Sequence, residues 1–411
     1  MIPYLVCFFI VISLSWILEK ILKGTCESGI TLGKTLTKKQ KALLCTVLSV
    51  LIIFLPAILA GLRDVTVGTD VIPYMTPTFE FAVSSRSMGE LIARCSNSFL
   101  GNTEEGFLLI AFLISRFTDN IHWFLFFITL FITTLTFFTL FRLKEHCSLW
   151  LGETVFLFLC YGDGLNIARQ CMALSVFLLS LSFVLDRKYL IGAIICILGW
   201  YFHRSILFAA FILMVVVLFQ ELGPVFNQKY DRFVKKENNK LAAFSLKHLT
   251  NDNARIIFYC LLIVLGVIVF LPTANLLYRI GILPEKYGIY FVNNSESGFI
   301  WKAYLLYLSS YLPLLFYKRK IWNNEVFLLL AFADAVFYLL QMWMPFLYRV
   351  SLYFLCIRIL SLSQIRISVP FKLNRDYLCT YGTVILSFMY WFGFCVFWNN
   401  NEIVPYLFMW K

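Results

Sequence analysis

Long uninterrupted runs of apolar residues constrain this chain more than any other feature of its sequence. Two of them, IPYLVCFFIVISLSWIL and ALLCTVLSVLIIFLPAIL, occupy residues 2–18 and 42–59. A helix needs roughly 20 apolar residues to cross the hydrocarbon core of a bilayer. The other spanning structure, a β-barrel, is built from short segments of alternating hydrophobicity instead. The runs therefore predict an all-α, polytopic integral membrane protein.

The composition agrees with a membrane protein. Only 14% of the residues are charged, whereas a soluble domain carries about 25%. The 43 phenylalanines and 21 tyrosines suit lipid-facing surfaces and interfacial belts. The twelve cysteines are scattered and form no CxxC pair, so neither a zinc site nor a disulfide framework is indicated.

The apolar runs predict about twelve transmembrane helices in one domain that comprises residues 1–411. The stretch GFLLIAFLISRF (106–117) is too short to cross, so it indicates an interfacial or re-entrant helix. The spans are expected at approximately 2–18, 42–60, 121–141, 148–162, 171–185, 189–202, 205–219, 256–272, 299–316, 325–342, 349–363 and 377–398.

The basic residues orient this domain, because Lys and Arg gather in cytoplasmic loops. With the N-terminus outside, the loops that face the cytoplasm hold 23 of the 35 basic residues. The main cytoplasmic loop is then about 220–255, and the longer outer loops are about 61–120 and 273–298. The net charge of +12 therefore reflects inner loops, and we expect no nucleic-acid partner.

Polar side chains stand at the outward ends of several predicted helices. An arginine at the bilayer centre costs roughly 2.5–3.5 kcal/mol on insertion scales, so such residues are expected at an interface, in ion pairs or in a wet cavity. We expect them to face one outer cavity. They are Arg63, Asp70 and Tyr74 in GLRDVTVGTDVIPY, Arg169 and Gln170 in NIARQ, His203 and Arg204 in WYFHRSIL, and Arg349 and Tyr353 in LYRVSLYF.

Two interpretations of the arginines remain open. They can form structural ion pairs, Arg63 with Asp64 or Asp70, and Arg169 with Asp163. Alternatively they hold a phosphate or pyrophosphate, whose oxygens accept paired hydrogen bonds from guanidinium groups. The second interpretation suits the set better, because few carboxylates are expected at the outer helix ends to pair with Arg204 and Arg349.

The remaining acidic and basic residues suggest general-base chemistry with few catalytic groups. Asp70 or His203 is the candidate general base for activating a hydroxyl, and Asp70 is preferred because it lies on a glycine-flanked loop. Glu104 is either a helix cap or a cavity acid, and Asp334, inside a predicted span, is expected to have a buried partner. The four histidines and scattered acids show no metal-ligand pattern, so we expect no metal and no cofactor.

Taken in order, these segments resemble the EpsG/Wzy-type polysaccharide (O-antigen) polymerase family. The resemblance rests on GLRDVTVGTDVIPY, EEGFLLIAFLI, NIARQCMALSVFLLSL, WYFHRSIL, LYRVSLYF and IVPYLF, which fall within residues 61–408. The chain departs from the family pattern at Ala168, where an aliphatic residue is usual, at Arg204 directly after the histidine, and at Glu105, where proline is frequent.

The resemblance implies a GT-C-like fold in the bacterial inner membrane, with an active site toward the periplasm. It implies a polymerase that transfers a growing glycan from undecaprenyl pyrophosphate to a new lipid-linked repeat unit. The expected partners are the undecaprenyl-pyrophosphate-linked oligosaccharide as donor and acceptor, membrane lipid, and a chain-length regulator protein. The same donor and a similar fold would serve an O-antigen ligase-like glycosyltransferase, and a flippase of the lipid-linked oligosaccharide is a third interpretation.

The candidate residues receive hypothetical roles on the polymerase interpretation. The catalytic set is Asp70, His203 and Arg169, acting without metal. Arg169, Arg349 and Arg63 grip the pyrophosphate. The supporting substrate-binding residues are Tyr74, Gln170, Arg204 and Tyr353, with Tyr74 stacking on sugar rings.

Overall fold

The computed structural model describes residues 1–23, 37–101, 103–236, 301–317, 321–342, 347–365 and 375–410, together with residues 257, 260, 261 and 319. In these residues the regular structure is helical, and the β pairing found there is one isolated bridge between Arg63 and Phe408. The prediction of an all-α chain is therefore confirmed for the described residues.

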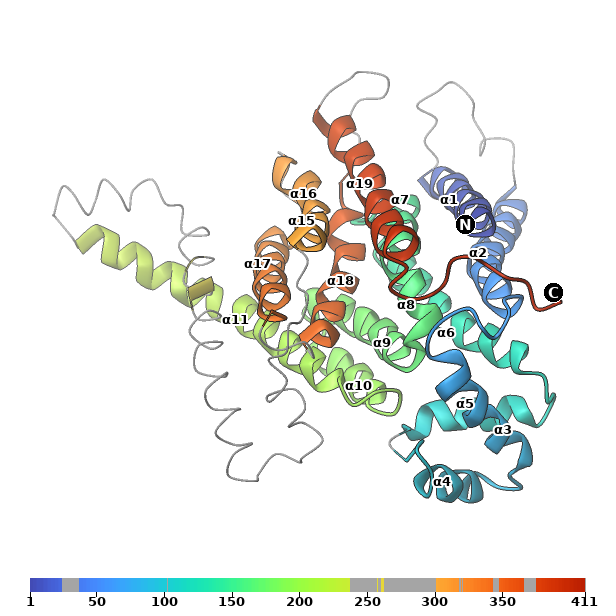
Figure 1. Ribbon diagram of the computed structural model, residues 1–411. Coiled ribbons are helices and arrows are strands. Elements are labelled where there is room, and N and C mark those ends of the chain that lie inside the picture. The colour runs from blue at the N-terminus through green and yellow to red at the C-terminus, as the bar shows by residue number, and fades with distance from the viewer. Residues whose placement is uncertain are drawn as a thin grey trace, which may run out of the picture.

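The N-terminal helices form one side of the bundle (Figure 1). Helix α1 (Ile2–Lys23) packs against α2 (Lys38–Gly61), and α2 packs against α6 (Ile121–Arg142). A capping box starts α2, because the Thr37 hydroxyl accepts from the Gln40 amide at 3.3 Å and the Gln40 side chain accepts from the Thr37 amide at 2.9 Å.

Between α2 and α6 the chain forms four short elements at one end of the bundle, which we call the outer cap (Figure 1). The outer cap packs on the first turn of α6. The rings of Phe79 and Phe107 each lie 5.2 Å from the ring of Phe124. Its elements are η1 (Val71–Met75), α3 (Thr76–Ser84), α4 (Met88–Ser96) and α5 (Glu105–Ser115).

The middle of the chain supplies a long and largely buried helix, α9 (Ala168–Leu185). It packs against α6, α10, α11 and α18, so both of its ends lie at junctions between elements. The other elements of this part are α7 (Leu149–Val155), η2 (Phe156–Cys160), α8 (Tyr161–Asn166), α10 (Tyr189–Gly199) and α11 (Ile206–Lys236).

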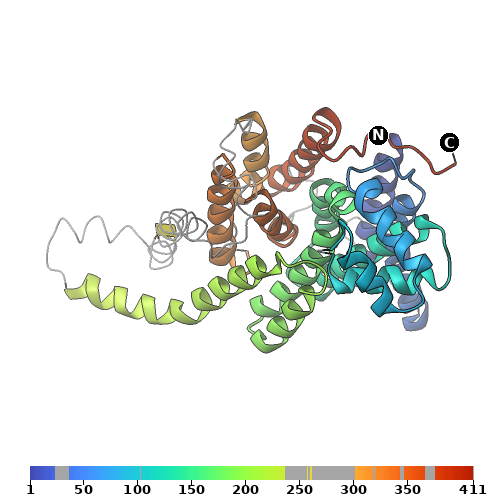
Figure 2. The same cartoon turned by 60° about the horizontal axis from the view of Figure 1, so that its bottom comes forward.

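The C-terminal elements pack on the opposite side of α9 from the outer cap (Figures 1 and 2). They are α15 (Trp301–Ser309), α16 (Leu312–Phe316), α17 (Asn324–Leu340), α18 (Tyr348–Leu362), α19 (Arg375–Trp391) and η5 (Phe392–Phe397). After η5 the chain returns to the end of α2. There the Asp64 amide donates to the Leu407 carbonyl at 2.8 Å, and the Met409 amide donates to the Leu62 carbonyl at 2.9 Å.

Six of the described helical segments are long and apolar enough to cross a membrane, which supports a membrane-embedded protein. Helices α5 and α10 are apolar but shorter. The predicted span at 256–272 and outer loop at 273–298 lie outside the described residues, apart from three positions, so the count of about twelve stays a prediction. The six segments are Ile2–Lys23, Lys38–Gly61, Ile121–Arg142, Ala168–Leu185, Ile206–Gly223 and Arg375–Phe397.

The first part of the predicted cytoplasmic loop at 220–255 is helical, which does not test on which side of the membrane it lies. Helix α11 continues without interruption through Lys236, so residues 220–236 are helical. The apolar run ends near residue 219, but helix formation does not, because the following residues include good helix formers such as Gln, Glu and Lys. The rest of this predicted loop lies outside the described residues.

A buried ion pair joins the C-terminal helices. Asp334 of α17 and Arg358 of α18 are both fully buried, with 2.6 Å between Oδ2 and Nη2. The hydroxyls of Tyr307 and Tyr311 donate to the same carboxylate at 2.6 Å each, and the guanidinium lies over both rings. This is the partner that the sequence analysis expected for Asp334.

Candidate functional site

A small pocket lies where the outer cap meets α9, the start of α18 and the bend between α10 and α11. It encloses about 50 Å³. The structure brings six of the nine predicted site residues to this pocket. Its lining consists of Asp70, Tyr74, Met75, Thr78, Thr103, Phe107, Asn166, Ile167, Ala168, Arg169, Gln170, His203 and Arg349.

The loop that carries Asp70 is fastened to α8. The Asp70 amide and the Thr69 hydroxyl both donate to the Asn166 side-chain oxygen, at 2.9 and 2.6 Å. Gly68 takes a φ of 104°, which favours glycine, and its amide donates to the Glu402 carbonyl at 3.0 Å. In the Gly-Thr-Asp sequence, Gly68 therefore provides a left-handed turn, and the Thr69 hydroxyl and Asp70 backbone amide are both held by the Asn166 side chain.

Burial and two cations act in opposite directions on Asp70. Burial raises the pKa of its carboxyl group above the usual value, and the positive charges of Arg169 and Arg349 oppose that rise. A carboxylate with a raised pKa is a stronger base than an exposed aspartate. Its environment thus suits a group that takes up a proton during a reaction.

Arg169 is held by Glu104. Its Nη1 lies 2.8 Å from Glu104 Oε2, and the Glu104 side chain is only 8% exposed. The other carboxylate oxygen accepts from the Arg204 amide at 3.2 Å. Although Glu104 stands at the N-cap position of α5, its side chain makes no capping bond. It pairs with the pocket residue Arg169 and does not itself line the pocket.

Asp163, which the sequence offered as a partner for Arg169, has other contacts. Its Oδ1 accepts from the Asn401 side chain at 2.9 Å and from the Tyr348 hydroxyl at 3.3 Å. The ion-pair interpretation of Arg169 therefore holds for a different acid, one that lies 65 residues earlier in the chain.

Close backbone packing places Glu104. The amide of Gly106, in the first turn of α5, donates to the Tyr201 carbonyl at 2.7 Å. A Cβ atom at Gly106 would lie only 2.6 Å from that carbonyl oxygen. The glycine thus allows the start of α5 to approach the α10–α11 bend closely enough for Glu104 to reach both Arg169 and Arg204.

His203 has a defined hydrogen-bonding role. Its Nδ1 accepts from the Ser205 amide at 3.1 Å, and Ser205 Oγ lies 2.8 Å from the hydroxyl of Tyr353. Burial lowers the pKa of His203 to about 4, and the charges of the two pocket arginines add to this. The imidazole is therefore neutral at pH 7, and since Nδ1 accepts, the proton resides on Nε2. Such a histidine can donate through Nε2 but cannot accept a proton there.

Gln170 links two parts of the pocket. Its side-chain amide donates to the backbone carbonyl of Arg349 at 2.7 Å. Because Gln170 is buried in the first turn of α9 and Arg349 stands in the first turn of α18, this bond fixes the two helix starts relative to each other. The segments that carry Arg169 and Arg349 are thereby joined.

Three predicted site residues do not line the pocket. Arg63 is 2% exposed, and its Nε and Nη1 have no hydrogen-bond partner among the described residues. Asp64, a suggested partner, accepts from Thr66 instead. Tyr353 is fully buried and reaches His203 only through Ser205, whereas Arg204 is exposed and contributes its backbone amide to Glu104.

The sequence analysis missed Asn166 and left Glu104 outside the site. Asn166 directly precedes the Ile-Ala-Arg-Gln segment and is a buried polar residue at an outward helix end, so the criterion that selected Arg169 would have selected it too. Phe107, Thr78 and Thr103 also line the pocket. Their side chains carry no charge, and nothing in their sequence context separates them from ordinary cap residues.

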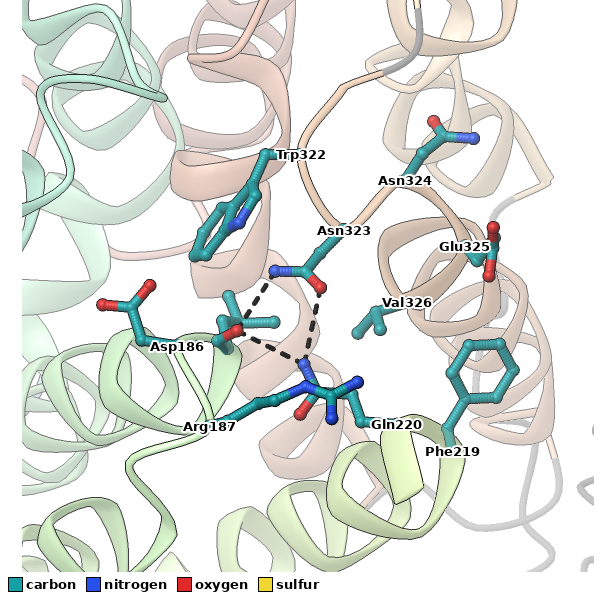
Figure 3. A pocket seen from close by; sticks show the side chains of 10 residues that line it. Asp186, Arg187, Phe219, Gln220, Trp322, Asn323, Asn324, Glu325 and Val326 are labelled. Atoms are coloured by element: carbon teal, nitrogen blue, oxygen red, sulfur yellow. Dashed lines mark hydrogen bonds between the residues drawn. The ribbon is translucent and has the colours of Figure 1, made fainter. Parts of the chain in front are cut away.

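A larger cavity of about 440 Å³ lies at the other end of α9 (Figure 3). Gln220 and Asn323 both donate to the carbonyl of Leu185 at 3.3 Å, and Gln220 also donates to the Asn323 side chain at 3.4 Å. These amides join α9, α11 and the start of α17. None of the predicted site residues lines this cavity, and it lies at the end predicted to face the cytoplasm.

Among the described residues, no group of three or more His, Cys, Asp or Glu side chains is arranged to hold a metal ion. The outer pocket offers two guanidinium groups, a half-buried carboxyl group and a neutral imidazole. This set of groups can bind an anion and move a proton.

Comparison with known proteins gives one match. No curated protein and no solved structure matches the chain significantly. The EpsG family model matches residues 46–408, a range that includes every residue of the outer pocket. The chain therefore belongs to the EpsG family, and this membership indicates a glycosyltransferase-type polysaccharide polymerase.

Proposed function

We propose that this protein is a metal-independent glycosyltransferase of the bacterial inner membrane that polymerises lipid-linked repeat units at the periplasmic face. The donor is the growing glycan on undecaprenyl pyrophosphate, and the acceptor is a new lipid-linked unit. The observation that carries the proposal is the outer pocket, which gathers Asp70, Arg169 and Arg349 from three distant segments.

The chemistry follows from these three groups. The acceptor hydroxyl attacks the anomeric carbon of the donor, and the bond from that carbon to the pyrophosphate oxygen breaks as the glycosidic bond forms. The hydroxyl proton passes to Asp70, whose pKa is raised by burial. Arg169 and Arg349 stabilise the negative charge of the departing undecaprenyl pyrophosphate through charge-assisted hydrogen bonds.

His203 is assigned a donor role. With Nδ1 accepting from the Ser205 amide, its Nε2–H is the group available to an oxygen of the substrate. This arrangement supports Asp70 rather than His203 as the proposed base. Tyr353 supports His203 through Ser205 and does not contact the substrate directly.

The pocket must widen to accept its substrates. Its volume of about 50 Å³ is well below the roughly 300–1,000 Å³ of small-molecule sites. The outer cap supplies Asp70, Tyr74 and Phe107 to the lining, so a displacement of the cap from α9 enlarges the pocket. Membrane lipid surrounds this entry, and a chain-length regulator protein is the further partner we propose.

The test is an in vitro reaction of the purified protein with its undecaprenyl-pyrophosphate-linked repeat unit in the presence of a metal chelator. We expect a ladder of products on a gel, which Arg169→Ala abolishes. Arg86→Ala, an exposed arginine of the outer cap away from the pocket, is the matched control and should retain the ladder. Transfer to a single core acceptor without a ladder would indicate a ligase, and translocation of unchanged substrate in vesicles would indicate a flippase.

A further inference from the structure

Helix α5 has two unlike faces. Phe107, Ala111 and Ile114 are buried against the rest of the outer cap and α6. On the other side Leu109 is 45% exposed and Leu113 is 52% exposed. Phe117 follows at the same spacing of four, in the turn after the helix, and is 88% exposed. Residues four apart share one face of a helix, so these three side chains form a continuous apolar row.

The depth of this row in the membrane follows from its neighbour α6. Phe107 of α5 packs on Phe124 in the first turn of α6. In that same turn Trp123 is 51% exposed, and Phe127 one turn further along is 41% exposed. Tryptophan is enriched where a spanning helix meets the membrane–water interface. The first turn of α6 therefore marks the outer interface, and α5 lies at its level.

We infer that α5 lies in the outer leaflet of the bilayer, with the acyl chains of membrane lipids covering Leu109, Leu113 and Phe117. A helix of 11 residues is about 16 Å long and is too short to cross the hydrocarbon core. An interfacial position buries its apolar row without requiring the helix to cross. The row continues the exposed apolar surface of α6, a helix that is long enough to span the membrane.

A cation at the edge of the row completes the pattern of an interfacial helix. Arg116 is exposed and stands between Leu113 and Phe117 in sequence, with its guanidinium 4.4 Å from the Phe112 ring and bonded to the Ala82 carbonyl at 2.7 Å. Interfacial helices combine an apolar face with basic residues that meet lipid phosphates. Arg116 is thus placed for a lipid headgroup while the row beside it meets acyl chains.

This membrane contact also bears on the outer pocket. Glu104 directly precedes α5, and Phe107 of its first turn lines the pocket. The same helix α5 therefore contacts lipid through its apolar row and positions Glu104, the partner of Arg169, at its start. The inference itself stands on the exposure and position of α5 and does not depend on the proposed reaction.

The test uses the full chain in nanodiscs of phosphatidylethanolamine and phosphatidylglycerol. The photoreactive residue p-benzoylphenylalanine replaces Leu113 or Phe117, and phospholipid adducts are measured by mass spectrometry after irradiation. The Phe117 position is the safer one, because its ring is almost fully exposed and little packing is lost. Ala93, exposed on α4, is the matched control, since Figure 1 shows α4 beyond α5 on the side away from α2 and α6.

We expect phospholipid adducts at both positions of the row and none above the unirradiated background at Ala93. Equal adducts at all three positions would overturn the inference, because they would show no preference of the membrane for this face. Protein–protein crosslinks without lipid adducts would assign the row to a second protein copy instead. Absence of any adduct in a protein with wild-type thermal unfolding would also overturn it.

Discussion

Glu104 and Arg169 form an ion pair of 2.8 Å between the start of α5 and the start of α9. Asp70, Arg169 and Arg349 line the outer pocket, and Glu104 adds a second carboxylate in contact with Arg169. An arriving pyrophosphate therefore competes with a carboxylate that already occupies one guanidinium. The pair positions Arg169 before the substrate binds, and it also sets how strongly an anion is held.

Substitution Glu104→Gln separates these two effects. The glutamine oxygen still accepts from Arg169, but the negative charge is lost, and the side-chain NH2 group cannot accept from the Arg204 amide. We expect inorganic pyrophosphate to inhibit the polymerase at about tenfold lower concentration, which corresponds to about 1.4 kcal/mol. Glu105→Gln, which alters the exposed neighbour, should leave the inhibition constant unchanged. Equal inhibition of both variants would contradict the competition.

Substitution Asp70→Asn tests the proposed base. We expect the rate of chain formation to fall by roughly 10²–10⁴, the usual contribution of general acid–base catalysis. Because only the carboxylate accepts a proton, wild-type activity should decline as the pH falls through the raised pKa of Asp70. The residual activity of Asp70→Asn should lack that decline. Asp119→Asn, at an exposed position of the outer cap, serves as the control for a change of charge.

His203 should affect stability in acid. Its pKa is about 4 in the folded protein and near 6.5 when unfolded, so the unfolded chain binds the extra proton first. Stability should therefore decrease as the pH falls from about 6.5 toward 4. The comparison is the thermal midpoint at pH 7.5 and at pH 5 for the wild type and for His203→Gln. We expect the smaller decrease for the variant, and equal decreases would show that the pKa of His203 does not change on folding.

The buried pair of Asp334 and Arg358 should matter chiefly for folding. Removing one member leaves an uncompensated buried charge, so Asp334→Leu should lower the free energy of unfolding by about 3–5 kcal/mol. The double variant Asp334→Leu with Arg358→Met should recover much of that loss. The exposed pair of Arg187 and Glu221 offers a control, because Arg187→Ala there should cost less than about 1 kcal/mol.

Gly106→Ala should displace the start of α5. The added methyl group would lie 2.6 Å from the Tyr201 carbonyl oxygen, and both partners are backbone, so the cap has to shift away from the α10–α11 bend. We expect chain formation to fall at least as far as in Glu104→Ala, with a lower thermal midpoint. Gly89→Ala faces open space and should change neither. A fully active Gly106→Ala would show that close packing here is dispensable.

The charged residues of the pocket could be predicted because the ends of transmembrane helices can be inferred from the sequence. Apolar runs fix where helices stop, and alternation across the membrane puts Asp70, Arg169, His203 and Arg349 at the same end. The sequence did not predict how deeply each side chain is buried at that end of the bundle. Tyr353 stands one helical turn after Arg349, which is about 5.4 Å further into the bundle, and that turn separates a pocket residue from a buried one.

Arg63 and Glu104 show a second reason for the differences. Arg63 stands at the end of a predicted span, where exposure is expected, but it is buried, and its backbone pairs with Phe408 at the far end of the matched family region. Glu104 looks like a helix cap, and its true partner lies 65 residues away. Contacts between segments so far apart leave no local pattern to read.

Because residues 407–409 pair with the end of α2, the structure around residues 62–68 is completed by residues synthesised long after them. The loop that carries Asp70 is fastened at Gly68 by the carbonyl of Glu402, a residue made hundreds of positions later. A chain that ends before Glu402 therefore lacks this bond, while Asn166 still holds the loop through the Thr69 hydroxyl and the Asp70 amide. We therefore expect a chain truncated before Glu402 to position the Asp70 loop less firmly than the full chain does.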